Sequence, residues 1–317
     1  MLRRFLPSVV AFSEPLAEVI VADNASTDDS LQLLRSGFPS VRVITLDRNY
    51  GFAEGYNRAI SQVSTPYVLL LNSDVEVTPH YLEPLHAYLE ANPGVAAVQP
   101  KLRAEWRRTH FEYAGAAGGF IDNLGYPFCR GRIFSNVEPD NGQYDSPAIV
   151  HWTTGAAMLA RTHIYKELGG LDSRFFAHME EIDLCWRMRN NGWLLACVPQ
   201  SVVYHVGGGT LPQGNPRKTF LNFRNNLLMI YKNHPDARRV LLRRRFLDAL
   251  AACAFLARFS FAEARAVWRA HRDFHKLKRF YQPGGCGICH EQTIPSILWQ
   301  YHVLRHRTFS QIFNEKQ

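Results

Sequence analysis

The sequence lacks several features that would place the protein in a bilayer, in an oxidising compartment or among dinucleotide-binding proteins. No apolar run reaches the roughly 18 residues that a membrane-spanning helix needs. The six cysteines show no disulfide spacing, and no strand-like run is followed by G-x-G-x-x-G. The amino terminus has two arginines and a short apolar run, but Pro7 interrupts it and no small-residue cleavage site follows directly, so a signal peptide is not indicated. These absences predict a cytoplasmic protein without a spanning segment.

Composition predicts a folded protein with one strongly basic segment. The 317 residues suffice for one large α/β domain and an appendage. Contents of 46% hydrophobic and 20% charged residues are ordinary for a globular chain. Residues 238–279 contain twelve Lys and Arg against three Asp and Glu, a net charge of +9, so the rest of the +8 chain carries about −1. We therefore expect this segment to meet a local acidic partner.

Short apolar runs alternate with helical segments early in the chain. The run Tyr67–Leu71 leads into Asn72-Ser73-Asp74 and is typical of a strand buried on both faces. Further strands are predicted at Glu18–Asp23, Val41–Leu46 and Val95–Val98. This alternation predicts a mostly parallel sheet with covering helices, an α/β fold. Residues 100–148, which are rich in Gly, Asn, Pro and aromatics, are expected to form loops and short antiparallel strands over the site.

The character of the chain changes at Pro235, after which it is arginine-rich and helical. We therefore divide it into an α/β domain, residues 1–235, and a basic amphipathic helical region, residues 236–317. The apolar run Phe246–Phe261 follows five arginines, which suits a helix that lies on an anionic membrane surface. Nucleic-acid binding and a helical pair packed inside the protein are the alternatives.

Three polar residues stand at the ends of predicted strands. Asp74 lies where open α/β sheets bind ligands, and its carboxylate could hold Mg²⁺ or Mn²⁺ against a diphosphate; the alternative is a helix cap. Asp23 could accept hydrogen bonds from a nucleobase or ribose, or could form a capping turn. His205, which precedes three glycines, could be structural or could complete a metal site.

Two further clusters allow a functional and a structural interpretation. The segment Arg48–Ile60 places glycine and asparagine around a helix start, where backbone N–H groups either face an anion or form a tight turn. The segment Phe175–Arg187 crowds Glu180, Glu181 and Asp183 into a first helical turn. These carboxylates either stabilise the helix or lie in a partly dry pocket, where burial would raise a pKa and suit the group to act as a base.

The sequence Cys286-Gly-Ile-Cys289-His290 matches the attachment pattern of c-type haem. Haem attachment would require export, which no signal supports. A labile zinc or redox pair and plain reduced thiols are the other two interpretations, and reduced thiols are favoured.

Together these segments resemble the bacterial family 2 glycosyltransferases, particularly their rhamnosyltransferase-like branch. The matching pieces occur in the family's order and cover roughly residues 18–233. They are VADNASTDDS, LDRNYGFAEGYNRAI, YVLLLNSDV, HWTTGAAMLARTHIYKELGGLDSRFFAHMEEIDLCWR, VYHVGGG and FLNFRNNLLMIYKN. The resemblance implies that residues 1–235 form a GT-A domain that uses a nucleoside-diphosphate sugar and a divalent metal, Mn²⁺ or Mg²⁺.

The resemblance also implies a role for individual residues. Asp74 would bind the metal and His205 would be a further metal contact. Glu181 would be the base that deprotonates the acceptor hydroxyl, with Glu180 and Asp183 as the next candidates. The nucleotide side would be formed by Asp23, Asn24, Asn49, Asn57 and Ser73. The acceptor side would be shaped by Trp152, Gly155 and Arg187.

The chain departs from the family pattern in two places. The family usually has Glu-Asp where this chain has Glu180-Glu181, which puts the position of the base in doubt. Family members also open with a strand that holds the nucleobase, whereas residues 2–12 of this chain are already helical in character. We therefore expect the first strand to be missing, and our hypothesis is that the natural protein begins upstream.

The resemblance implies an inverting hexosyl or rhamnosyl transferase. A single displacement would move the sugar to a hydroxyl of a cell-surface glycan acceptor, expected to be lipid-linked, without a covalent sugar–enzyme intermediate. We expect a cytoplasmic protein, peripheral on the inner face of the cell membrane, and no nucleic-acid partner. The alternative is a catalytically impaired nucleotide-sugar-binding protein, because a missing strand would remove part of the donor site.

Overall fold

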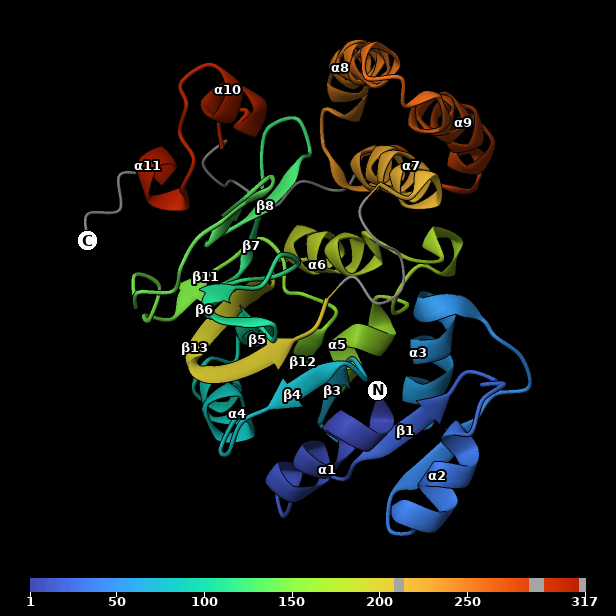
Figure 1. Ribbon diagram of the computed structural model, residues 1–317, viewed down its shortest axis with the longest axis vertical. Coiled ribbons are helices and arrows are strands. Elements are labelled where there is room, and N and C mark those ends of the chain that lie inside the picture. Colours follow the sequence, from blue (N-terminus) through green and yellow to red (C-terminus); the bar gives the residue numbers. More distant parts are fainter. Residues whose placement is uncertain (208–213, 285–293, 314–317) are drawn as a thin grey trace.

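The computed structural model describes residues 1–207, 214–284 and 294–313, and it confirms the α/β class (Figure 1). The strands of its main sheet are β3 (Tyr67–Leu71), β4 (Val75–Val77), β5 (Val95–Ala104), β6 (Arg107–Phe111), β11 (Ala148–Ile149), β12 (Ala157–Arg161) and β13 (Leu194–His205). Within the described residues this sheet is seven-stranded, in the order β11-β13-β5-β12-β3, with β4 paired to β13 and β6 to β5. The motif Cys286–His290 lies outside the described residues.

The main sheet is mixed, whereas the alternation of runs predicted a mostly parallel one. Strands β5 and β13 run parallel, with Ala97 opposite Leu195. Strand β12 runs antiparallel to both of its neighbours, and its Leu159 lies opposite Val98 and Leu69. A parallel neighbour needs a long crossover connection, usually a helix. No helix lies between β5 and β12 in this part of the described chain, and the direction of β12 reverses accordingly.

Strands β1 (Ile20–Asp23) and β2 (Arg42–Thr45) form a separate two-stranded parallel sheet. No strand of the described chain pairs with the edge of β3 that faces away from β12. Only Leu70 of β3 is fully buried, so the prediction that this strand is buried on both faces is wrong, because β3 lies at a sheet edge.

A small antiparallel sheet lies beside the main one. Its strands are β7 (Gly119–Ile121), β8 (Pro127–Cys129), β9 (Arg132–Ile133) and β10 (Asn136–Val137). Trp152 and Gly119 form a bridge that joins it to the segment before β12. The expectation of loops and short antiparallel strands in residues 100–148 is therefore confirmed.

Helices cover the sheets and form the carboxyl-terminal layer (Figure 1). They are α1 (Leu2–Ser13), α2 (Ser30–Gly37), α3 (Gly51–Ser61), α4 (Leu82–Ala91), α5 (Thr162–Glu167), α6 (Glu180–Asn190), α7 (Pro216–Asn233), α8 (Ala237–Ala257), α9 (Phe261–Leu277), α10 (Ile297–His302) and α11 (Phe309–Phe313). Single 3₁₀ turns occur at Ser173–Phe175 and Lys278–Phe280. Helix α6 has acidic residues in its first turn and arginines in its last, as the helix dipole favours.

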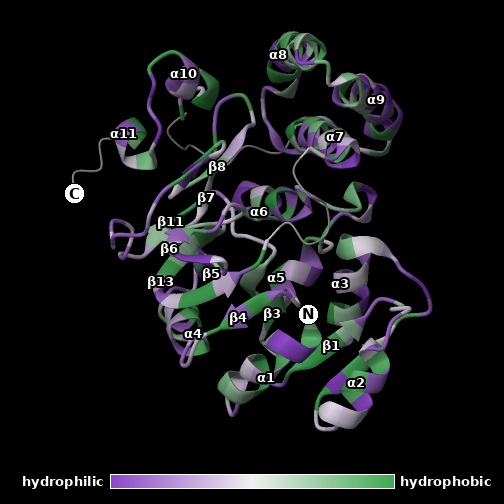
Figure 2. Cartoon of the chain, viewed as in Figure 1, coloured by the Kyte–Doolittle hydropathy of each residue, from purple (hydrophilic) through white to green (hydrophobic). Residues whose placement is uncertain are grey.

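Helices α8 and α9 pack against α7, and Figure 2 shows hydrophobic and hydrophilic residues interspersed along both. Arg244 of α8 is buried; its guanidinium lies 3.3 Å from Asp248 Oδ1, donates to the Leu124 carbonyl at 3.2 Å and stacks 3.8 Å over the ring of Tyr126. The division at residue 235 stays a prediction, and these contacts cross it. In the described part of the chain, no helix is both long and apolar enough to cross a bilayer.

Candidate active site

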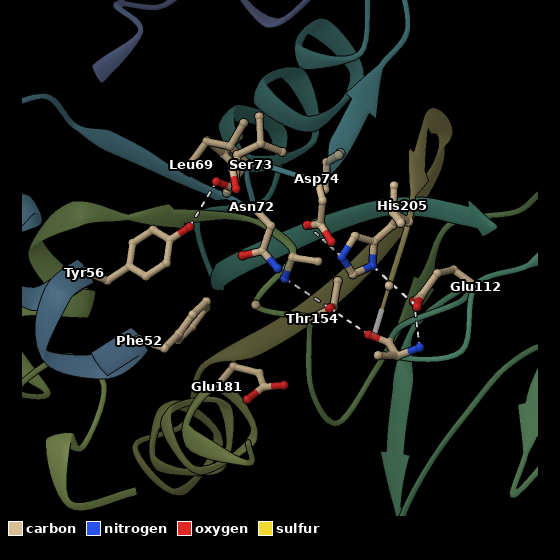
Figure 3. Close-up of a pocket in the computed structure, with 18 of the residues that line it drawn as sticks. Phe52, Tyr56, Leu69, Asn72, Ser73, Asp74, Glu112, Thr154, Glu181 and His205 are labelled. Atoms are coloured by element: carbon tan, nitrogen blue, oxygen red, sulfur yellow. Dashed lines mark hydrogen bonds and ion pairs between the residues drawn. The ribbon is translucent and has the colours of Figure 1, made fainter. Parts of the chain in front are cut away.

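A cavity of about 1930 Å³ opens where β1 and β3 end. Its lining comes from α1, β1, α3, β3, the segment Thr154–Ala156, the start of α6 and the end of β13, and Figure 3 shows part of it. Ligands of open α/β sheets bind at the carboxyl ends of strands. The volume exceeds the roughly 300–1,000 Å³ of ordinary small-molecule sites, so the cavity has room for two substrates and further space beyond them.

Asp74 and His205 meet at this cavity because their strands pair. Strand β4, directly after Asp74, runs antiparallel to β13, which places Val75 opposite His205. Nε2 of His205 lies 3.2 Å from Oδ1 of Asp74, and Nδ1 lies 3.4 Å from Oε1 of the buried Glu112 (Figure 3). The imidazole therefore lies between two carboxylates.

This arrangement perturbs the protonation of both Asp74 and His205. Burial lowers the pKa of His205, but hydrogen bonding to Asp74 and Glu112 and the charges of the two carboxylates raise it overall to about 10. Burial raises the pKa of Asp74, whereas hydrogen bonding to His205 and its charge bring that pKa below its ordinary value. Asp74 is therefore held as a carboxylate that faces the cavity.

The residues around Asp74 fit a divalent cation that is shared with a diphosphate. Asp74 offers a carboxylate, which both Mn²⁺ and Mg²⁺ accept, whereas His205, with a pKa of about 10, would have to release its proton before its imidazole could bind Mn²⁺. Across residues 1–207, 214–284 and 294–313, no group of three or more His, Cys, Asp or Glu side chains is placed to hold a metal. Only one or two protein ligands are needed where substrate phosphates and water complete the coordination.

Glu180 and Glu181 begin α6 at the wall of the same cavity. Glu181 points into the open space opposite Asp74 and His205 (Figure 3). Burial raises the pKa of Glu181 to about 7. Burial, followed by the charge of Glu181, raises the pKa of Glu180 well above its ordinary value. Of the two, Glu181 is therefore the carboxyl that ionises near neutral pH.

The loop before α6 has an unusual backbone. Phe176, His178 and Met179 have φ angles of 65°, 69° and 71°, in the left-handed region that residues other than glycine rarely adopt. The Asn225 side chain of α7 donates to the carbonyls of Phe175, Ala177 and His178 at 3.0, 2.9 and 2.7 Å. Strained backbone persists where its surroundings impose it, so Asn225 holds the loop that aims the glutamates.

Asp183 and Arg187 lie on α6 but do not line the cavity. Asp183 is fully buried, and its carboxylate accepts from Arg187 Nε at 2.9 Å, Lys232 Nζ at 2.8 Å and Asn233 Nδ2 at 2.8 Å. Arg187 also donates to the Leu168 carbonyl and, at 2.7 Å, to that of Gly170. Both side chains join α6 to α7 and to the turn after α5.

The asparagines and the aspartate that were predicted on the nucleotide side form hydrogen bonds within the protein. Asp23 is buried and accepts from Ser26 N–H at 3.3 Å, in a turn that lies before α2 and does not cap it, because the N-cap of α2 is Asp29. Asn24 lines the cavity and donates to the Gly51 carbonyl at 2.9 Å. Asn49 accepts from Gly51 N–H at 2.9 Å. Asn57 lies off the cavity and donates to the Leu171 carbonyl at 2.6 Å.

The other predicted residues line the cavity. Ser73 is exposed there, next to Asp74. Trp152 is buried, and its indole N–H donates to the Phe120 carbonyl at 3.0 Å. Gly155 faces Glu181, because a Cβ on Gly155 would lie 3.4 Å from the Glu181 Cβ. Gly155 is therefore adjacent to Glu181, and Trp152 lines the same cavity.

Three residues of the site were absent from the sequence prediction. Glu112 lies in a segment without a clear period, so only the fold brings it to His205. Tyr56 lines the cavity and donates to the Leu71 carbonyl at 3.0 Å, which ties α3 to the end of β3 (Figure 3). Asn225 lies in the motif FLNFRNN, but the sequence does not show that its side chain reaches back to the loop before α6.

Comparison with known proteins shows which proteins this chain is similar to. The family described as Glycosyl transferase family 2 matches residues 1–155. The N-acetylglucosaminyl-diphospho-decaprenol L-rhamnosyltransferase of Mycobacterium tuberculosis is 28% identical over 219 residues, which are 64% of this chain and 71% of the relative. Rhamnosyltransferase WbbL of Escherichia coli is 27% identical over 163 residues, 49% of this chain and 61% of the relative.

Solved structures share the fold. GalNAc-T7 with UDP, GalNAc and Mn²⁺ matches with a TM-score of 0.55 and 17% identity, over 72% of this chain and 44% of its own. The mannosyltransferase PcManGT from Pyrobaculum calidifontis, in complex with GDP-Man and Mn²⁺, matches with a TM-score of 0.51 and 15% identity, over 88% of this chain and 77% of its own.

The fold and the comparisons define a glycosyltransferase with the GT-A fold, so the predicted class and fold are confirmed. More particularly, the first 155 residues of the chain match the family 2 glycosyltransferases, and rhamnosyltransferases are among the proteins it is similar to.

Proposed function

We propose that this protein transfers a hexosyl or rhamnosyl group from a nucleoside-diphosphate sugar to a hydroxyl of a lipid-linked glycan, with inversion at the anomeric carbon. One observation supports this most: a carboxyl with a pKa of about 7, Glu181, faces the ionised Asp74 across one cavity. Glu181 as a base on one side of the cavity, and Asp74 as an anchor for the leaving diphosphate on the other, suit a single in-line displacement. The relatives named as rhamnosyltransferases support the sugar class.

Asp74 and His205 would hold a divalent cation against the donor diphosphate. Such a cation, when bound, neutralises charge on the leaving diphosphate. Glu112 keeps the ring of His205 oriented, because Nδ1 of the ring lies 3.4 Å from its carboxylate. Asn24 and Ser73, which line the cavity beside β1 and β3, are proposed to contact the nucleotide.

Glu181 would take the proton of the acceptor hydroxyl as that oxygen attacks the anomeric carbon. A base is effective when its pKa is close to the working pH, and burial places the pKa of Glu181 at about 7. Trp152 and Gly155 leave space beside Glu181 for the acceptor. The sugar–oxygen bond forms as the bond to the diphosphate breaks, so no covalent intermediate on the protein is required.

Helix α8 is proposed to rest on an anionic membrane surface, where a lipid-linked acceptor would be found. Leu242, Phe246 and Leu250 are 68%, 67% and 50% exposed, and their four-residue spacing places them on one helix face. Exposed arginines, Arg238 and Arg243 among them, flank this stripe. An apolar face bordered by cations is the pattern of an interfacial helix. On this proposal the protein is peripheral on the inner face of the cell membrane.

A catalytically impaired nucleotide-sugar-binding protein is the second candidate, favoured by the edge of β3 beside the donor side of the cavity, which no strand of the described residues pairs with. The two functions differ in one product. A panel of nucleotide sugars is incubated with the protein, Mn²⁺ and lipid-linked acceptors, and nucleoside diphosphate is measured. Release that depends on both donor and acceptor supports transfer, whereas donor binding without release supports the second candidate.

A further inference from the structure

Helix α10 and the two residues after it expose an apolar surface. Trp299, Val303 and Leu304 are 57%, 51% and 47% exposed. Trp299 and Val303 lie on one helix face, because they are four positions apart and the Val303 N–H donates to the Trp299 carbonyl at 3.0 Å. Ile297 and Tyr301, which lie on the opposite face, are buried and half-buried. The helix therefore has one apolar face toward the protein and a second one toward solvent.

The small antiparallel sheet holds this segment in place. The Ile297 N–H donates to Oδ2 of the buried Asp122 at 2.8 Å, and the Phe309 N–H donates to Oε1 of the buried Glu138 at 3.1 Å. The ring of Phe309 lies 5.0 Å from that of Phe120 in β7. Buried carboxylates that lose such a donor pay a desolvation penalty, so these contacts resist a rotation of α10 that would hide its outer face.

The charge around this surface is of one sign. Residues 294–313 contain no Asp or Glu, and their arginines are Arg305 and Arg307. Arg305 and His302 are exposed next to Val303 and Leu304. An exposed apolar patch marks a contact with a protein or a membrane. A tryptophan beside aliphatic side chains and arginines, without acidic residues, favours the headgroup region of an anionic membrane.

The turn Asp122–Tyr126 supports both α10 and α8. Asp122 accepts from α10, while the Leu124 carbonyl accepts from Arg244 of α8 at 3.2 Å and the Arg244 guanidinium stacks over Tyr126. Both helices lie at the same end of the long axis of the molecule (Figure 1). Their exposed faces can therefore meet one surface at the same time.

Helix α10 also borders the wall of the large cavity. Phe134 and Asn136 line this cavity, as do Asp74 and Glu181. The Tyr301 ring of α10 lies edge-on to the Phe134 ring at 4.9 Å. The Asn136 side chain donates to the backbone carbonyl of Arg307 at 3.2 Å. One side of α10 thus supports the cavity wall, and the other side is exposed to solvent.

We propose that α10 and the residues up to Arg307 form a second membrane contact, in which Trp299, Val303 and Leu304 enter the headgroup region of an anionic bilayer. This contact would place the Phe134 wall of the cavity at the membrane surface, where a lipid-linked acceptor would enter. The inference deepens the proposed function, and this entry route rests on it. The membrane contact itself is tested without activity.

The test measures tryptophan fluorescence of the full chain bound to vesicles of phosphatidylcholine and phosphatidylglycerol. Vesicles with brominated acyl chains quench indoles that enter the bilayer, and vesicles with ordinary chains are the reference. Trp299→Phe removes the indole but keeps an apolar ring. Trp106→Phe is the matched control, because Trp106 is 74% exposed on the turn between β5 and β6. Sedimentation with the same vesicles gives the affinity of Trp299→Ser.

We expect brominated vesicles to quench the parent protein and Trp106→Phe equally, and Trp299→Phe less. Trp299→Ser should weaken vesicle binding by roughly three- to tenfold, because the apolar area of the ring is no longer withdrawn from water. A lipid-linked acceptor carried in vesicles should then be glycosylated more slowly by Trp299→Ser. A water-soluble acceptor with the same glycan should be glycosylated at the parent rate.

Equal quenching of the parent protein and Trp299→Phe would overturn the inference and leave α8 as the membrane contact. Shielding of Trp299 from iodide that grows with protein concentration, in the absence of vesicles, would also overturn it, because a second copy would then cover α10. Failure of the parent protein to bind the vesicles would overturn it together with the proposal for α8. Trp299 quenching without sugar transfer to either acceptor would contradict the proposed function and support the membrane contact.

Discussion

Replacing Glu181 with Gln should remove the base and at the same time stabilise the fold at alkaline pH. Turnover should fall by about 10²–10⁴, the usual contribution of a positioned general base, with donor affinity nearly unchanged. The stability effect follows from burial, which raises the pKa of Glu181 from 4.5 to about 7. A buried residue with only a structural role would show the stability gain but not the pH dependence of turnover.

The direction of the stability effect can be worked out from the two pKa values. Between pH 4.5 and 7 the folded protein holds a proton on Glu181 that the unfolded chain has released, so the free energy of unfolding falls as pH rises. Above pH 7 the whole loss in the free energy of unfolding is present. The difference between the two pKa values limits this loss to about 3 kcal/mol. We expect on the order of 1–3 kcal/mol, because the Glu181 side chain is only half-buried. Glutamine does not ionise, so the variant avoids this loss.

Two assays check the prediction. Nucleoside diphosphate release is measured from pH 5 to 9, where the parent should gain activity through about pH 7. Thermal unfolding is measured at pH 5 and pH 8, where Glu181→Gln should raise Tm by a few degrees more at pH 8 than at pH 5. Glu167→Gln, an exposed carboxylate outside the cavity, is the matched control and should change neither. Full turnover in Glu181→Gln, with the loss in Glu180→Gln instead, would refute our assignment.

Other substitutions test other parts of the site. Asp74→Ala should abolish turnover and the tightening of donor affinity by Mn²⁺, and unchanged activity in EDTA would remove the metal from the mechanism. Glu112→Gln should weaken Mn²⁺ binding by about 10–100-fold, the usual cost of losing an outer-shell partner, and an unchanged Mn²⁺ titration would contradict its role. Asn225→Ala should lower turnover by loosening the loop before α6, seen as faster hydrogen exchange at residues 176–179. Phe246→Ser should weaken binding to anionic vesicles, with Leu194→Ser, 45% exposed on β13, as control.

The sequence predicted the elements well because periodicity and strand-end positions depend on local patterns. The run before Asp74 formed a strand, and Asp74 and His205 met as expected because each follows or ends a strand. The burial of that strand was mispredicted, since an apolar run does not show which neighbours are present. The motif residues Asn57, Asp183 and Arg187 show another limit: their side chains hold elements together, and sequence alone does not separate that task from ligand binding.

Glu112 and Asn225 show why the rest of the site could not be predicted. Glu112 is 93 positions away from His205 in the chain. Its backbone N–H donates to Leu102 of β5, and β5 pairs with β13, the strand that ends at His205. Asn225 acts on a loop 47–50 positions earlier through three carbonyls. Neither contact leaves a local pattern, because both arise from packing between distant elements.

The most direct test of a sugar transferase is a comparison of nucleoside diphosphate release by the parent protein and by Asp74→Ala. Both are incubated with a panel of nucleotide sugars, Mn²⁺ and a lipid-linked glycan acceptor, and the glycosylated product is followed by mass spectrometry. The account predicts release with at least one donor, matched by an equal amount of glycosylated acceptor, and none from Asp74→Ala. Equal release by both proteins, or donor binding by the parent protein without release from any donor of the panel, would contradict it.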